Sequence, residues 1–207
     1  WSSMSWQLGA VIGPLVAGVF IATLGIQKGL LFVIMVLLVL FVPLSQIKKK
    51  PILKKEKEPI LHSITEGIKF VIQTPELLAA QLLDMFSVLF GGAIALLPVY
   101  QKEILHINEI GFGALRAAPG IGAIATLGLL SFLPLKTQPG KKLFLCVTGF
   151  ALSIIIFGIS TNVYLSFFML FLSGMFDAVS VVIRSTILQL LTPDAMRGRV
   201  SAVNTIF

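Results

Sequence analysis

Cysteine and histidine are nearly absent from this sequence of 207 residues. Because Cys146 is the only cysteine, the chain can form no internal disulfide and no metal site with several cysteine ligands. The two histidines, His62 and His106, stand far apart in predicted loops, so the sequence gives no support to a histidine-based metal site. We therefore expect neither a metal centre nor a cofactor.

Charged residues are also scarce, at 12% of the chain, whereas 57% of the residues are hydrophobic. Soluble domains contain about 25% charged and about 45–50% apolar residues, so this chain has too little polar surface to enclose itself in water. Its natural solvent is a lipid bilayer. The net charge of +7 comes without interleaved aromatic and basic residues, which argues against a nucleic-acid partner.

Common catalytic motifs are missing too. The sequence has no Gly-x-x-x-x-Gly-Lys-Ser/Thr phosphate loop, no His-Glu-x-x-His and no Gly-x-Ser-x-Gly element. We therefore expect a protein that is not an enzyme. The chain also has no signal-peptide pattern, and it starts at Trp1 and stops at Phe207 inside an apolar pattern. These ends lead us to expect an internal segment of a longer protein.

The abundant feature is the long apolar run. A membrane-spanning helix needs about 20 mostly apolar residues, and six stretches meet this need, namely residues 5–24, 29–46, 77–100, 111–133, 143–159 and 163–191. The fold class predicted from them is all-α, a polytopic transmembrane helix bundle. Residues 101–110 and 160–162 are predicted to be connecting loops.

The segment from 47 to 76 differs from these spans. It begins with a basic, solvated stretch that contains Pro51 and Pro59, which prevent a long helix. Over residues 60–73 apolar side chains recur at helical spacing, which predicts a short helix on the membrane surface. Thr74, Pro75 and Glu76 then have the pattern of a helix start.

The basic residues are distributed unevenly between the loops. Lys28 and Lys102 fall on one side of the predicted membrane, and twelve of the sixteen basic residues fall on the other, namely Lys48, Lys49, Lys50, Lys54, Lys55, Lys57, Lys69, Lys136, Lys141, Lys142, Arg197 and Arg199. Cytoplasmic loops carry such an excess of Lys and Arg. The pattern therefore places both ends of the chain in the cytoplasm.

Four charged residues lie inside predicted spans: Asp84, Asp177, Arg184 and Arg116. Charges at membrane depth are costly and commonly functional. At 1.5 Å per residue, Asp84 and Arg184 both lie about 10 Å from the cytoplasmic face, so we expect them to pair. Asp177 is the first candidate for proton coupling and Asp84 the second. A static salt bridge between helices remains the alternative for the pair, and snorkelling to the outer interface the alternative for Arg116.

Glycine and proline are combined in three of the spans. Small residues let helix backbones approach closely, and proline can bend a helix. The combination predicts helices that bend or slide past one another, as in transporters, rather than ordinary packing alone. The residues concerned are Gly9, Gly13, Pro14, Gly18, Gly91, Gly92, Pro119 and Gly120.

These segments resemble a known family. The first span, GAVIGPLVAG, is similar to the Gly-Pro motif in the fifth helix of major facilitator superfamily exporters. The fourth span, GFGALRAAPGIGA, and the run TPDAMRGRVSAVN resemble the enterobactin-exporter-like branch of bacterial efflux permeases. The resemblance implies helices five to ten of twelve, with residues 1–46 closing the N-terminal half, 47–76 joining the halves, and 77–207 opening the C-terminal half.

The resemblance also implies a function. It predicts a proton-coupled secondary transporter that exports a siderophore or drug by alternating access. The expected partners are the lipid bilayer, a small-molecule substrate and protons, and the full-length chain is expected to be a monomer in the bacterial inner membrane. Asp194, Arg197 and Arg199 would form a cytoplasmic gate loop, or merely set the topology. An importer, a lipid flippase, and a non-transporting scaffold or receptor remain alternatives.

Overall fold

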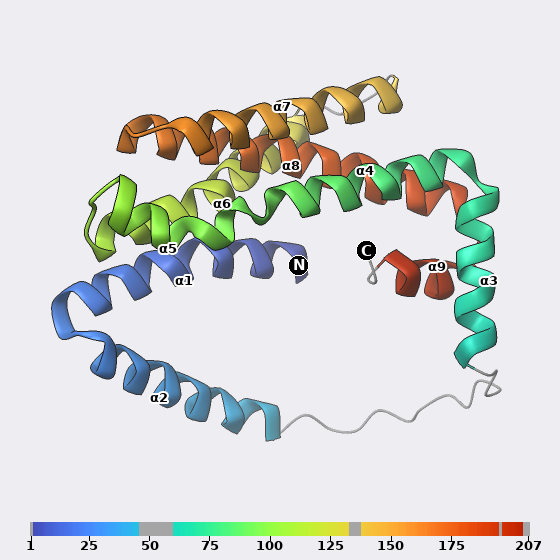
Figure 1. The fold of residues 1–207 in the computed structure, drawn as a ribbon. Helices are drawn as coiled ribbons and strands as arrows, with labels where there is room; N and C mark the ends of the chain where they lie inside the picture. Colours follow the sequence, from blue (N-terminus) through green and yellow to red (C-terminus); the bar gives the residue numbers. More distant parts are fainter. Residues whose placement is uncertain (1, 46–59, 133–137, 195, 205–207) are drawn as a thin grey trace.

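The structure is a computed structural model that describes residues 2–45, 60–132, 138–194 and 196–204. Within these ranges nearly all residues are helical and none forms a strand, so the all-α prediction is confirmed. The long helices lie roughly along one direction, while a short helix crosses one end of the bundle (Figure 1). The basic stretch at 47–59 lies outside the described residues.

Five of the six predicted spans are confirmed as helices long and apolar enough to cross a membrane: Ile26–Pro43, Pro75–Ile104, Glu109–Phe132, Pro139–Ile159 and Val163–Leu191. The first predicted span forms the helix α1 (Ser2–Leu24), but its apolar part is the shorter Val11–Leu24.

The helix ends follow from local chemistry. Gly25 separates α1 from α2 (Ile26–Ser45) with a φ of +79°, a conformation that glycine adopts without strain. At α8 (Val163–Leu191), the predicted turn is confirmed, because the side-chain oxygen of Asn162 accepts hydrogen bonds from the backbone N–H of Tyr164 and Leu165. Such a cap satisfies donors that a helix start leaves free.

The third span is interrupted. The helix α4 (Pro75–Gly91) starts after Thr74, as predicted, and ends at the glycine pair. A 3-10 turn, η1 (Gly92–Leu96), then leads into α5 (Leu97–Val99) and a π-helical turn, η2 (Tyr100–Ile104). The break is expected, because glycine favours helices weakly and Pro98 lacks a backbone donor. The predicted loop at 101–110 is corrected, since helical structure continues to Ile104.

Helix α6 (Glu109–Phe132) is the centre of the bundle. It packs against α1 on one side and α8 on another, and α8 also packs against α7 (Pro139–Ile159). The fully buried side chains of Leu115, Phe157 and Leu170 join these helices in one apolar cluster. By contrast, α2 contacts mainly α1 and presents exposed apolar side chains along its length.

Glycines form the two closest helix crossings. A Cβ added to Gly18 of α1 would lie 2.7 Å from the Glu109 carbonyl oxygen, and one added to Gly113 would lie 2.6 Å from that of Pro14. Where α6 crosses α8, a Cβ on Gly122 would collide with the Phe171 carbonyl oxygen. Helix backbones can approach this closely only where a side chain is absent.

Three predicted packing glycines do not take part in these crossings. A Cβ on Gly9 or Gly13 would meet no atom within 4 Å in the part of the chain that the structure describes, and the same holds for Gly92. Of the four residues named in the first span, Pro14 and Gly18 contact α6. Gly18, five residues after Gly13, is the glycine of α1 that packs on α6.

The predicted short helix over residues 60–73 is confirmed. Helix α3 (Ile60–Gln73) lies across the end of the bundle and beside α9 (Arg197–Asn204) (Figure 1). The two helices share an apolar cluster with the start of α4, and its buried members are Val71, Leu77, Val200 and Val203. This contact holds α3 and α9 near the ends of α4 and α8, where the charged site lies.

Candidate functional site

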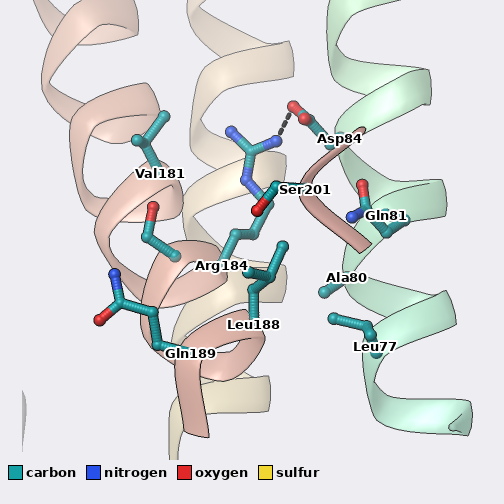
Figure 2. Close-up of a pocket in the computed structure, with 10 residues that line it drawn as sticks. Leu77, Ala80, Gln81, Asp84, Val181, Arg184, Leu188, Gln189 and Ser201 are labelled. Atoms are coloured by element: carbon teal, nitrogen blue, oxygen red, sulfur yellow. Dashed lines mark ion pairs between the residues drawn. The ribbon is translucent and has the colours of Figure 1, made fainter. Parts of the chain in front are cut away.

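The site is built around an ion pair between two helices. Arg184 on α8 contacts the carboxylate of Asp84 on α4, as predicted from their equal depth (Figure 2). Both side chains are largely buried, with 14% and 21% of their surfaces exposed. A buried guanidinium paired with a carboxylate avoids the cost of an unpaired charge at membrane depth.

A second carboxylate approaches the same arginine. Asp177 lies two turns earlier on α8, and its Oδ1 is 3.8 Å from the Nη2 of Arg184. Asp177 is more open than Asp84, because 52% of its side-chain surface is exposed. Residues seven apart lie on one helix face, which explains why the two side chains of α8 meet. One guanidinium therefore serves two carboxylates from two helices.

The ion pair lines a cavity of about 370 Å³ between α4, α8 and α9. Figure 2 shows Asp84 directed across this space toward Arg184, with Gln81 one turn away on α4. Ser185, Gln189 and Ser201 supply further polar groups, and the rest of the lining is apolar. The arrangement is a small, partly polar chamber at the end of the bundle that α3 and α9 cover.

The loop after α8 brings its predicted charges into contact with neighbours. Arg197 forms an ion pair of 2.8 Å with Asp194, and its Nη2 donates to the Gln189 carbonyl oxygen at 3.3 Å. Arg199 forms an ion pair of 2.7 Å with Glu66 of α3. Arg197 is thus bound at the end of α8, and Arg199 connects α9 to α3.

Arg116 lies two turns inside α6, where it lines another cavity. This cavity encloses about 330 Å³ between α1, η1, α6 and α8. Asp177 lines it as well, together with Pro14, Pro119 and Gly120. The structure thus brings Arg116 and Asp177 to one space, a proximity that depth in the membrane alone did not predict.

Sequence reasoning missed several residues of the site, among them Gln81, Ser201 and Glu66. Gln81 is buried and lines the first cavity three residues before Asp84, which is one helix turn, so its spacing could have identified it. Ser201 and Glu66 come from α9 and α3. Their positions depend on how α3 and α9 dock against the bundle, and no local sequence pattern indicates that docking.

Metal coordination receives no support from the geometry. Among the described residues, no group of three or more His, Cys, Asp or Glu side chains is close enough to hold a metal ion. The charged groups instead alternate in sign along α8 and its neighbours, from Arg116 through Asp177 and Arg184 to Asp84.

Known proteins resemble the chain over its whole length. The sequence profile of the Major Facilitator Superfamily matches residues 1–207. The protein described as enterobactin exporter EntS of Shigella flexneri is 30% identical over 199 residues, or 96% of this chain and 47% of that protein. The protein of the same description from Citrobacter koseri is 27% identical over 199 residues, covering 96% and 48%.

The chain therefore spans about half the length of the curated relatives it matches. The corresponding protein of Escherichia coli O1:K1 / APEC is 28% identical over 202 residues, again 96% of this chain and 48% of the relative. No solved structure matches the chain.

Proposed function

Because the chain belongs to the major facilitator superfamily, we propose that it is part of a secondary active exporter of small organic molecules. The export is driven by protons and proceeds by alternating access in a bacterial inner membrane. Support comes from the relatives, whose description is enterobactin exporter, and from five helices apolar enough to span a bilayer. The full-length protein works as a monomer.

The observation that carries the proposal is the position of Arg184 between Asp84 and Asp177. When Asp177 is ionised, it competes with Asp84 for the guanidinium. When Asp177 takes up a proton, Arg184 is left to Asp84 alone, which strengthens the tie between α8 and α4. Protonation thus changes the hold between two helices, and a ligand or proton can drive a conformational change only through such a difference.

Two features support Asp177 as the proton carrier rather than Asp84. Asp177 is more exposed and faces a cavity, so protons can reach it. Asp84 contacts Arg184 directly and is mostly buried, so its carboxylate is already paired and less accessible from the cavities. The contact between Asp84 and Arg184 then changes in response to the proton on Asp177. The contacts of Arg197 and Arg199 hold α3 and α9 against the end of α8.

The test is gradient-driven efflux by the full-length protein carrying Asp177→Asn. Efflux of the native substrate or an accumulated dye should fall to the level of cells without the protein, while expression and melting temperature stay near wild type. The matched control is Glu103→Gln, an exposed acid on η2, which should transport normally. Unchanged, gradient-dependent efflux in the Asp177→Asn protein would refute the coupling role.

A further inference from the structure

The cavity shared by Arg116 and Asp177 has the properties of a ligand site. Small-molecule sites typically enclose about 300–1,000 Å³ and combine apolar walls with a few polar groups. This cavity has about 330 Å³, and its lining consists of two oppositely charged side chains with six small or apolar ones, namely Pro14, Ile94, Pro119, Gly120, Ala123 and Gly174. It is distinct from the chamber that contains Asp84.

The walls of the cavity are held in place by helix packing. A Cβ on Gly174 would collide with the Pro119 carbonyl oxygen, so α6 and α8 touch backbone to backbone beside the cavity. Where α1 crosses α6, the Pro14 carbonyl oxygen lies against Gly113. Because these contacts involve backbone atoms, they set how closely α6 approaches α1 and α8 beside the cavity.

The two charged side chains that line this cavity lack a close ion-pair partner among those residues that the structure describes. Arg184 has Asp84 in direct contact, whereas Asp177 has only the longer approach of 3.8 Å. Arg116 has no ion pair within the described ranges of the chain. A guanidinium binds carboxylate-like oxygens through two parallel hydrogen bonds, and a carboxylate accepts hydrogen bonds from ammonium or amide N–H groups.

We propose that this cavity binds a zwitterionic small molecule, an inference that rests on the transport function proposed above and names its substrate class. The anionic oxygens of the ligand bind Arg116, its ammonium group binds Asp177, and its apolar part lies against Pro14, Pro119 and Ala123. A purely anionic ligand would face the Asp177 carboxylate, and a purely cationic one would face Arg116. Only a ligand with both charges satisfies both walls.

The experiment measures binding of three probes that share one ring and differ in charge. They are radiolabelled phenylalanine, a zwitterion; phenylalaninamide, a cation; and N-acetylphenylalanine, an anion. The full-length protein in lipid nanodiscs should bind phenylalanine about tenfold more tightly than either analogue, because each analogue loses one charge-assisted contact. Arg116→Gln should bind phenylalaninamide as tightly as phenylalanine, and Asp177→Asn should do the same for N-acetylphenylalanine.

The matched controls are Lys102→Gln and Glu103→Gln, exposed charges of both signs on η2 that lie outside the cavity. Both should keep the wild-type preference. If Arg116→Gln does not fold, Arg116→Lys must retain the preference for a carboxylate, and the wild-type comparison decides the question. Equal binding of the three probes, or binding of none, would overturn the proposal.

Transport is measured separately in proteoliposomes, so that the two proposals can fail independently. Gradient-driven efflux without a preference for the zwitterion would refute the ligand class and leave the exporter function intact. A clear zwitterion preference in a protein that shows no gradient-driven efflux would support the binding site and refute proton-coupled export.

Discussion

Arg184 lies within reach of two carboxylates, so the stability of the helix bundle does not depend on either one alone. Asp84 contacts its guanidinium directly, and Asp177 is 3.8 Å away. Breaking a buried ion pair usually costs about 3–5 kcal/mol, because one charge is left without a partner. Here the loss of one carboxylate leaves another within reach of the same arginine. The two acids should therefore substitute for each other in stability, although they differ in their proposed roles.

This arrangement predicts a non-additive double mutant. Asp84→Asn alone should destabilise the protein by less than the usual cost, Asp177→Asn by less again, and the double variant by more than the sum. Residues that share a partner show such coupling. Melting temperatures of the purified variants in a mild detergent test this, with Glu103→Gln as the control for the loss of an exposed acid. Strictly additive shifts would show that Arg184 does not move between the carboxylates.

The Asp84–Arg184 pair could be predicted from the sequence, because both residues lie at the same depth from one membrane face. Asp84 follows the start of its span, and Arg184 precedes the end of an antiparallel one. Depth says nothing of how each helix is rotated about its axis. For that reason the shared cavity of Arg116 and Asp177 was not predicted. The Glu66–Arg199 contact was missed for a related reason, since it depends on how α3 and α9 dock.

Helix crossings at the element scale depend on a few glycines. The combination of glycine and proline correctly marked α1, α6 and the break after Gly91, because these residues act through the backbone of their own helix. The sequence did not show which glycines face a neighbour: Gly18 and Gly122 lie at crossings, whereas Gly9 and Gly13 do not in the described part of the chain. A packing partner is a tertiary property that spacing alone does not specify.

Helix α6 offers a matched pair to test the crossing with α8. Gly122→Ala would push a methyl group into the Phe171 carbonyl oxygen, whereas a Cβ at Gly128 would meet nothing within 4 Å among the described residues. Overpacking of this kind costs about 1–3 kcal/mol, so Gly122→Ala should melt at a lower temperature. Gly128→Ala should be neutral or stabilised by up to about 1 kcal/mol, because alanine favours a helix. Equal melting of both variants would contradict the crossing.

On the scale of the whole molecule, loop charge and helix direction agree. The end of the bundle that α3 and α9 cover is also where α4 and α7 begin and where α6 and α8 end (Figure 1). Lys69, Lys141, Arg197 and Arg199 belong to elements at this end. Hydropathy predicted the long helices well, because each span must by itself be long and apolar enough to cross the bilayer. It could not predict how they pack.

Orientation is the last property that these charges predict. Positively charged loops stay in the cytoplasm, so the start of α7 should face inward and the start of α2 outward. Cys146, the only cysteine and buried in α7, can be replaced by alanine to give a background for Lys141→Cys and Lys28→Cys. A membrane-impermeant maleimide should label Lys28→Cys in right-side-out vesicles and Lys141→Cys only in inverted ones. Thr161→Cys, in the exposed turn before α8, should behave like Lys28→Cys. Labelling of Lys141→Cys from outside would reverse the topology and place the Asp84–Arg184 chamber at the periplasmic end.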